Sequence, residues 1–427
     1  MIVSEQDATE PFHHLMTKQF LSAVSPRLGL FFALAILSIH ISAGMAAPPA
    51  ALDGQGRLML GDKPFFPVGL YEVAIPEIRS VPRESFNVVA APYWAQGPQT
   101  TPEYLKAAGE GGSFLIAGLP FEQVRAKDDR FIERYVRAVK GDEHLLVWYA
   151  FEEPSGSHVT VEQGEFACQA IHKQDPARPI LFVDFQTKNV TAYRNCYDIF
   201  AYDFYPIGTS SIVYWRNMLK GVVQAAHPKP VWGVIQAFGH ADPKHDWVPP
   251  TPEEIRCMAY LAVIEGCQGI LFYSHGRRGD PFYVREHPEH WAFMQRLGAE
   301  LQALSPVLLS PVVDGGASVG NKSIDLILRR RVVAGNPPTA EMYLVAANMA
   351  HKTPAVERHY PGVRQADVRI VLKDVGDGQA EVVGSAGTGS AKAGRIVPIH
   401  GGAFVDSFDP YCVHVYRIIS ETRSHDR

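Results

Sequence analysis

The sequence lacks an excess of positive charge. Of its 427 residues, 40 are Lys or Arg and 45 are Asp or Glu, so the formal net charge is −5. A nucleic-acid-binding protein would show a basic patch or a high isoelectric point, and this charge balance therefore argues against a nucleic-acid partner. Low-complexity tracts and short fixed-period repeats are also missing, and the composition is that of a globular protein.

Cysteine is scarce. The five cysteines are an odd number and form no CxxC pair, which argues against a zinc site or a disulfide framework. Cys168, Cys257 and Cys267 stand in apolar surroundings typical of core residues. One disulfide in an oxidising compartment stays open as an alternative, with no pairing indicated.

A group of metal-binding side chains occurs in residues 240–246 (HADPKHD), but its spacing fits no zinc pattern. We interpret this segment as a solvated lid over the seventh strand. No metal and no cofactor is predicted.

Long apolar runs are rare as well. Residues 28–41 (LGLFFALAILSIHI) are too few for a comfortable membrane span, and no other segment could cross a membrane. Basic residues precede this run, and Gly44-Met45-Ala46 fits a small-x-small cleavage pattern. We therefore predict a secretory leader over residues 1–47 and a secreted or periplasmic protein whose mature chain begins near Ala47. An uncleaved N-terminal anchor is the alternative.

The chain does contain a regular alternation of short apolar runs and helical patterns. Residues 128–140, for example, carry acids at the start, bases at the end and apolar residues at helical spacing. Eight strand–helix alternations predict an α/β fold, a (β/α)8 TIM barrel over residues 48–304. A doubly wound sheet would need a Gly-rich phosphate loop after an early strand, and none is present. The apolar runs span residues 66–72, 87–91, 114–119, 145–149, 179–185, 197–206, 230–239 and 269–275.

The pattern changes at Ser305-Pro306, beyond which the chain is rich in β-like segments. These segments alternate in polarity or carry branched residues, and Gly-, Asn- and Pro-containing turn signals separate them. We predict a small all-β sandwich over residues 305–427, docked on the barrel because the link between them is short. The expected strands are residues 324–333, 340–347, 368–372 and 412–418.

The fourth apolar run ends in two adjacent carboxylates. Residues 145–154 read LLVWYAFEEP, so Glu152 and Glu153 are followed by a proline that cannot continue a β ladder. Barrel enzymes build their active sites from side chains that buried strands deliver at their C-terminal tips. The alternative is that the two glutamates open a solvated loop, because Glu is mostly an exposed residue.

This strand tip resembles that of the clan A glycoside hydrolases. In that clan the fourth strand ends Asn-Glu-Pro and its Glu is the acid/base, so the resemblance implies this role for Glu153. Glu152 replaces the Asn that contacts the sugar 2-hydroxyl. The clan's nucleophile is a Glu at the end of the seventh strand, where this chain has Gln236 and no carboxylate before Asp242.

The resemblance implies a secreted hydrolase that cleaves O-glycosidic bonds of a poly- or oligosaccharide. The alternative is a non-catalytic carbohydrate-binding barrel, motivated by Gln236 at the nucleophile position. Neither the sugar nor the oligomeric state follows from the sequence.

Glycoside cleavage needs an acid on the leaving oxygen and an anion or base on the opposite face of the sugar. A negative Glu152 would raise the pKa of Glu153, which suits an acid. Asp203, near the tip of the sixth run, is the first candidate for the partner, and Tyr205 shares its face by the two-residue period. Asp184, at the fifth run, is the second. Either aspartate could instead orient a loop through backbone amides, and Glu152 is itself a further candidate.

Residues near other strand tips are expected to bind the substrate. Gln236 would bond sugar hydroxyls or orient the acid, unless it is a core amide. Aromatic rings suit stacking on sugars, although many buried aromatics serve only the core. The predicted substrate-binding residues are Glu72, Tyr93, Trp94, Tyr205, Gln236, Tyr273 and His275.

Overall fold

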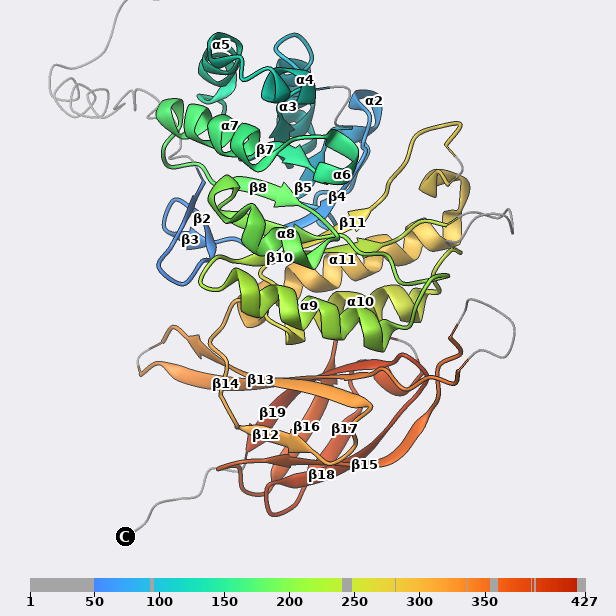
Figure 1. Ribbon diagram of the computed structural model, residues 1–427. Coiled ribbons are helices and arrows are strands. Elements are labelled where there is room, and N and C mark those ends of the chain that lie inside the picture. Colours follow the sequence, from blue (N-terminus) through green and yellow to red (C-terminus); the bar gives the residue numbers. More distant parts are fainter. Residues whose placement is uncertain are drawn as a thin grey trace, which may run out of the picture. The chain divides into compact units, whose positions relative to one another are not determined.

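The computed structural model describes residues 50–420, except 93–95, 240–247, 281, 336, 354–359, 385 and 388. A closed barrel of parallel strands is followed by two antiparallel sheets (Figure 1). The predicted TIM barrel and C-terminal β sandwich are therefore confirmed. The predicted leader, Tyr93, Trp94 and the lid segment of residues 240–246 lie outside the described residues.

The eight apolar runs all form barrel strands. They close the barrel in sequence order, and the last strand pairs with the first through Ile270 and Val68. A small antiparallel sheet precedes them, formed by β1 (Ala51–Leu52), β2 (Leu58–Leu60) and β3 (Lys63–Pro64). The barrel strands are β4 (Val68–Leu70), β5 (Val88–Ala90), β6 (Phe114–Gly118), β7 (Leu145–Glu152), β8 (Ile180–Val183), β9 (Ile199–Tyr202), β10 (Val231–Gln236) and β11 (Ile270–Tyr273).

Helices follow the barrel strands, and four of those described, at Asp129–Val139, Val161–Gln174, Ile212–Ala226 and Pro252–Ile264, begin at a side-chain cap. The Thr251 hydroxyl accepts a hydrogen bond from the Glu254 amide, and the Glu254 carboxylate accepts one from the Thr251 amide, a complete capping box. The last helix continues through Ser305-Pro306 to Leu308, beyond the predicted start of the β domain. The helices are α2 (Ile75–Ile78), α3 (Thr101–Gly111), α4 (Phe121–Arg125), α5 (Asp129–Val139), α6 (Pro154–Ser157), α7 (Val161–Gln174), α8 (Thr187–Ala192), α9 (Ile212–Ala226), α10 (Pro252–Ile264) and α11 (Pro288–Leu308), with short 3-10 turns at Arg194–Cys196, Val284–Glu286 and Gly389–Ala391.

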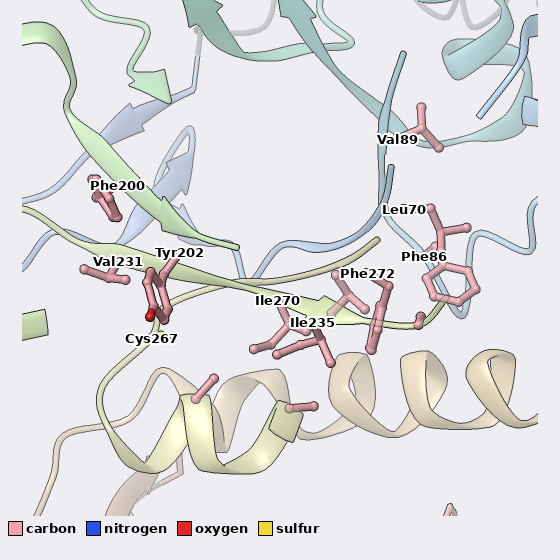
Figure 2. Close-up of a cluster of buried hydrophobic side chains, with 14 of the residues drawn as sticks. Leu70, Phe86, Val89, Phe200, Tyr202, Val231, Ile235, Cys267, Ile270 and Phe272 are labelled. Carbon is pink, nitrogen blue, oxygen red and sulfur yellow. The ribbon is translucent and has the colours of Figure 1, made fainter. Parts of the chain in front are cut away.

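Alternate strand residues face either the barrel interior or the surrounding helices. On β10, Trp232 and Val234 belong to the inner apolar cluster, whereas Ile235 belongs to the outer one. Figure 2 shows Ile235 with Phe272 of β11 between the strands and the helices. This two-residue period decides which side chains at the strand ends point into the mouth of the barrel.

The C-terminal domain is a sandwich of a three-stranded and a five-stranded sheet. Leu344, Ile370 and Tyr416 are among the buried side chains of its core. The four predicted strands are present, together with four that the sequence pattern did not reveal. The three-stranded sheet contains β12 (Ala317–Val319), β15 (Gln365–Leu372) and β18 (Ala403–Phe408), and the five-stranded sheet contains β13 (Ile324–Val333), β14 (Thr339–Asn348), β19 (Val413–Ser420), β16 (Gly378–Val383) and β17 (Ile396–Ile399).

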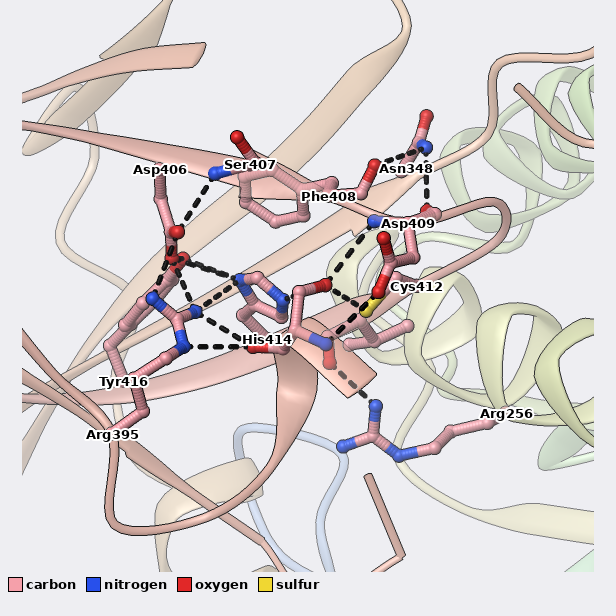
Figure 3. A network of polar contacts seen from close by, with 12 residues as sticks. Arg256, Asn348, Arg395, Asp406, Ser407, Phe408, Asp409, Cys412, His414 and Tyr416 are labelled. Carbon is pink, nitrogen blue, oxygen red and sulfur yellow. Dashed lines mark hydrogen bonds and ion pairs between the residues drawn. The ribbon is translucent and has the colours of Figure 1, made fainter. Parts of the chain in front are cut away.

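Buried charged groups join the barrel to the sandwich. Arg256 of α10 contacts Glu300 of α11 at 2.8 Å and donates a hydrogen bond of 2.6 Å to the carbonyl of Val413 on β19. Figure 3 shows Arg256 reaching from the barrel helices to the sandwich near Cys412 and His414. Glu300 in turn accepts a hydrogen bond of 2.6 Å from the amide of Ala386. The two domains are therefore connected through desolvated polar contacts, and residues 47–427 form one compact unit.

All five cysteines are buried and free, including the three that the sequence places in the core, Cys168, Cys257 and Cys267. Within the described part of the chain, no helix combines the length and apolar character needed to cross a membrane.

Candidate active site

A cleft of about 600 Å³ opens at the carboxyl-terminal ends of the barrel strands. This end of a TIM barrel carries the active site in characterised enzymes with the fold. The cleft is lined by several carboxylates, by aromatic rings and by one arginine, Arg277. The carboxylates are Glu72, Glu152, Glu153, Asp203 and Asp280.

A larger cavity, of about 830 Å³, lies between α10, α11 and the sandwich. Its carboxylates Glu253, Glu286 and Glu289 are exposed to solvent, and its buried Arg256 is already paired with Glu300. Buried titratable groups gather instead at the mouth of the barrel, which is why we assign the chemistry to the smaller cleft.

An irregularity in β7 brings two adjacent glutamates to the same cleft. Ala150 and Phe151 both belong to the outer apolar cluster, and the pairing register of β7 with β8 shifts between Tyr149 and Glu152. This bulge turns Glu152 inward. Glu153 would then face outward, but its backbone adopts φ 29° and ψ 84°, which redirects the side chain into the cleft.

The first barrel strand uses a related device. Tyr71 faces the inner cluster, and the next residue, Glu72, has φ 59° and also lines the cleft. A non-glycine residue at positive φ costs about 1–3 kcal/mol and is found preferentially at functional sites. Burial and the neighbouring Asp280 raise the pKa of Glu72, whereas Arg277 acts in the opposite direction.

Asp203 forms a pair with Glu153 at the base of the cleft. It follows the inward-facing Ala201 by two residues and is buried. Burial, the charge of Glu153 and a hydrogen bond to the Glu153 side chain raise the pKa of Asp203 well above its usual range. Two carboxyl groups in such contact disfavour ionising together, so Asp203 keeps a proton at pH values where an exposed aspartate has lost it. The Asp203 Oδ1 atom has no hydrogen-bond partner among the residues that the structure describes.

Glu152 is a third carboxyl beside this pair and is half-buried. Burial raises its pKa to about 7, with further contributions in the same direction from Glu153 and Glu72. The hydroxyl of Tyr149 donates a hydrogen bond to the Glu152 carboxylate, which favours the charged form and limits the rise. Glu152 therefore changes charge near neutral pH.

One wall of the cleft is aromatic. The rings of Tyr205 and Tyr273 are stacked, with centroids 5.4 Å apart and planes 23° from parallel. Phe238 meets both rings edge-on at 5.1 and 5.3 Å, and Tyr71 lies 5.9 Å from Tyr273. These rings offer a rigid, largely apolar surface in the same cleft as the carboxyl pair.

Asp184, Gln236 and His275 do not line this cleft. The Asp184 carboxylate accepts hydrogen bonds from the Gln186 amide at 2.8 Å and the Asn189 side chain at 2.6 Å, which fixes the turn after β8. This geometry matches the loop-orienting alternative considered for Asp184.

Gln236 is a buried amide whose hydrogen bonds are internal. Its Oε1 accepts from the Ile207 amide at 2.8 Å, and its Nε2 donates to the carbonyls of Ile207 and Phe238 at 3.2 and 3.3 Å. The side chain therefore ties the loop after β9 to the loop after β10, as the core-amide alternative predicts.

His275 is also fully buried. Its Nδ1 lies 2.9 Å from the carbonyl of Gly276 and 3.5 Å from the Glu77 carboxylate, and Arg285 donates to its Nε2 at 3.3 Å. Burial lowers the pKa of His275. Its contacts organise the loop after β11 and do not face the cleft.

Sequence reasoning missed two residues that matter to the cleft. Tyr149 reads as one more core aromatic, although a buried tyrosine hydroxyl usually needs a polar partner, which here is Glu152. Arg277 lies 3.3 Å from Asp280 on the loop after β11, where no pattern distinguishes it. No group of three metal-binding side chains suited to a metal ion occurs within residues that the structure describes.

No protein-family profile and no curated protein sequence matches the chain. Solved structures do. A glycoside hydrolase family 5 protein from Bacteroides vulgatus ATCC 8482 is 15% identical with a TM-score of 0.58, and the match covers 89% of this chain and 95% of that one. A protein described as a glycoside hydrolase is 13% identical (TM-score 0.56, 88% and 98% covered), and an Anoxybacillus alpha-amylase is 12% identical (TM-score 0.51, 82% and 90% covered). The chain thus shares the fold of glycoside hydrolases, as the resemblance of its fourth strand implied.

Proposed function

We propose that the protein is a glycoside hydrolase that cleaves O-glycosidic bonds of a poly- or oligosaccharide, with Glu153 and Asp203 as its catalytic carboxyl pair. The observation that carries this proposal is the contact between the Glu153 and Asp203 carboxyls, which share a hydrogen bond in an aromatic cleft at the mouth of the barrel. Two carboxyls in such contact do not ionise together, so one of them keeps a proton. One protonated and one ionised carboxyl are what glycoside cleavage requires.

The roles within the pair follow from burial and charge. In the free protein the more deeply buried Asp203 holds the proton, because its pKa is raised. The positive charge that develops on a bound sugar favours the ionised form of Asp203, so the proton passes across the hydrogen bond to Glu153. Glu153 then protonates the leaving oxygen, and Asp203 stabilises the opposite face as nucleophile or base. The direct hydrogen bond brings the carboxyls closer than the roughly 5–5.5 Å of retaining enzymes, so a bound sugar must separate them slightly.

Turnover of a panel of nitrophenyl glycosides and soluble polysaccharides tests this proposal. We expect cleavage of at least one member and loss of most of that activity in the Glu153→Gln variant. Both proteins need matching circular dichroism spectra, so that loss of activity is not loss of fold.

A second candidate, a non-catalytic carbohydrate-binding barrel, is favoured by Gln236. The seventh strand ends in Gln236 where a carboxylate would be needed. The side-chain amide of Gln236 forms its hydrogen bonds within the protein. Binding of a polysaccharide without turnover, unchanged by Glu153→Gln, would support this candidate over the hydrolase.

We also propose that the protein is exported and that its leader is removed near Ala47. The supporting feature is the short apolar run of residues 28–41 with a cleavage pattern behind it. N-terminal sequencing of the protein from cell fractions tests this. Full-length protein in the cytosol, beginning at Met1, would contradict export.

A further inference from the structure

Two aromatic side chains are strongly exposed within the described part of the chain, and both line the same groove. Phe185 follows β8 and is 37% exposed, and Tyr214 in the first turn of α9 is 51% exposed. The other strongly exposed large hydrophobic residues are valines and isoleucines at or beyond residue 312. Exposed apolar surface gathered in one hollow often marks a ligand-binding groove.

The groove has a volume of about 290 Å³, just below the roughly 300–1,000 Å³ of small-molecule sites. Its floor is aromatic, because Phe204 lies parallel to Tyr202 (centroids 6.4 Å apart, planes at 16°) and meets Tyr214 edge-on at 6.0 Å. Polar groups complete the lining on one side, from Gln186, Thr187 and the exposed Lys188.

This groove and the catalytic cleft share a wall. After β9, Asp203 and Tyr205 line the cleft, whereas Phe204 between them lines the groove. After β8, Val183 lines the cleft and Phe185 lines the groove. The two hollows are therefore separated by only two short strand ends.

Asp184 fixes one of these strand ends. Its hydrogen bonds to the Gln186 amide and the Asn189 side chain hold the turn that presents Phe185 to solvent. The exposed ring is therefore supported by a buried hydrogen-bonded turn.

We propose that this groove, lined by Phe185, Phe204 and Tyr214, is a second sugar-binding site that holds a more distant unit of the same polysaccharide chain. The inference rests on the proposed glycoside hydrolase function and adds that the substrate is a polymer or long oligosaccharide. One face of a pyranose ring carries C–H groups that pack on aromatic rings, and its outward hydroxyls match Gln186, Thr187 and Lys188. The groove lies next to the cleft, across the ends of β8 and β9, and this proximity favours a carbohydrate over a protein partner as the occupant.

The test uses Phe185→Ala, Tyr214→Ala and the double variant in the full chain. Ile396→Ala is the matched control, because Ile396 is exposed (55%) but lies on β17 of the sandwich. Binding is measured by affinity electrophoresis in gels containing barley β-glucan, xylan, galactomannan or pullulan. Activity is measured as kcat/KM on the polysaccharide that is cleaved and on a nitrophenyl monosaccharide.

We expect each single variant to weaken polysaccharide retention by about 3- to 10-fold, since a well-packed aromatic contact contributes on that scale. The kcat/KM on the nitrophenyl glycoside should be unchanged, because that substrate does not reach the groove. Ile396→Ala should behave like the wild type in both assays.

The outcomes separate this inference from the proposed function. One outcome is that the wild type cleaves polysaccharide while the double variant keeps the same ratio of kcat/KM on polysaccharide to kcat/KM on the nitrophenyl glycoside. That result would contradict the second sugar-binding site and support the hydrolase function. If the wild type is retained by none of the four polysaccharides, the groove has no carbohydrate role and the inference is overturned. If retention depends on Phe185 and Tyr214 but no polysaccharide is cleaved, the second sugar-binding site is supported and the proposed hydrolase function is contradicted.

Discussion

Glu153 and Asp203 share a hydrogen bond although β8 lies between the strands that carry them. The register explains the meeting. Glu152 pairs with Val183 and Val183 with Ala201, so Asp203 projects beyond this level while the turned backbone of Glu153 directs its side chain inward. Both the strained backbone and the shared proton oppose stability, which is typical of sites shaped by function.

The first prediction concerns Glu153. Replacing it by glutamine should keep the fold and the affinity for substrate but reduce kcat on unactivated glycosides by about 10²–10⁴-fold, the usual contribution of a positioned acid–base group. The defect should shrink for substrates with good leaving groups, because these need little protonation as they depart. Steady-state kinetics on glycosides with leaving groups of graded acidity measure this trend.

Glu103→Gln, an exposed acid on α3, is the control for charge removal at a distance. Near-normal activity of Glu153→Gln on an unactivated substrate would show that the acid assignment is wrong, and Glu152 would then be the next carboxyl to test.

The second prediction concerns the stability cost of Asp203. Its pKa is raised in the folded protein, so the native state keeps a proton that the unfolded chain has lost. Stability therefore falls as the pH rises above the ordinary aspartate value near 3.9. Asp203→Asn removes this ionisation, and the variant should be more stable than the wild type, by a margin that grows as the pH rises above about 4.

Urea unfolding at several pH values measures this margin. The same variant should lose activity on good and poor leaving groups alike, because in the proposed mechanism Asp203 acts on the opposite face of the sugar from the leaving group. A stability difference that is constant across the pH range would contradict the raised pKa.

Much of the fold was predictable because its information is local. The barrel strands are apolar runs buried on both faces, and their order in the barrel follows the order in the chain. The sandwich strands were harder. β12 spans only three residues, and β17 (IVPI) contains a proline, which is tolerated mainly in an edge strand. The pairing of these two strands is therefore determined by neighbouring strands and not by a local pattern.

The site was predictable where the two-residue period holds. Asp203 and Tyr205 reach the cleft as that period requires. Gln236 and His275 do not, because their partners Ile207 and Glu77 come from loops distant in the sequence. The bulge at Ala150 and Phe151, which aligns Tyr149 with Glu152, has no local signature in an all-apolar run.

The third prediction concerns the junction between the domains. The Oε1 atom of Glu300 accepts hydrogen bonds from Arg256 (2.8 and 3.0 Å) and from the Tyr260 hydroxyl (2.6 Å), and all three side chains are buried. Glu300→Gln leaves the Arg256 charge uncompensated, and we expect a loss of about 3–5 kcal/mol in the free energy of unfolding. Denaturant unfolding measures this loss.

A surface ion pair supplies the control for that variant. Glu133 contacts Arg137 at 2.7 Å, one turn along α5, with the arginine largely exposed. Glu133→Gln should cost only about 0–1 kcal/mol. The Arg256→Met/Glu300→Leu double variant should lose less than Glu300→Gln, since it buries no unpaired charge. Equal losses in all three variants would mean that the junction does not depend on this pair.

The last prediction concerns Glu152, whose pKa rises from an ordinary value of 4.5 to about 7. Between these values the folded protein holds a proton that the unfolded chain has released, so this group destabilises the wild type progressively from about pH 4.5 to pH 7. The full effect corresponds to roughly 3 kcal/mol, an upper value because nearby water screens a half-buried group.

Glu152→Gln removes this titration while keeping an acceptor for the Tyr149 hydroxyl. Its free energy of unfolding relative to the wild type should therefore increase across that pH window and become constant above it, as denaturant melts at pH 4.5, 6, 7 and 8 would measure. The same substitution should remove an inflection near pH 7 from the profile of kcat/KM, because that profile reports groups that ionise in the free enzyme. Tyr149→Phe is the matched variant: it deletes the hydrogen bond that favours the charged form, so the inflection should move to higher pH. A shift to lower pH would mean that the hydroxyl does not stabilise the carboxylate.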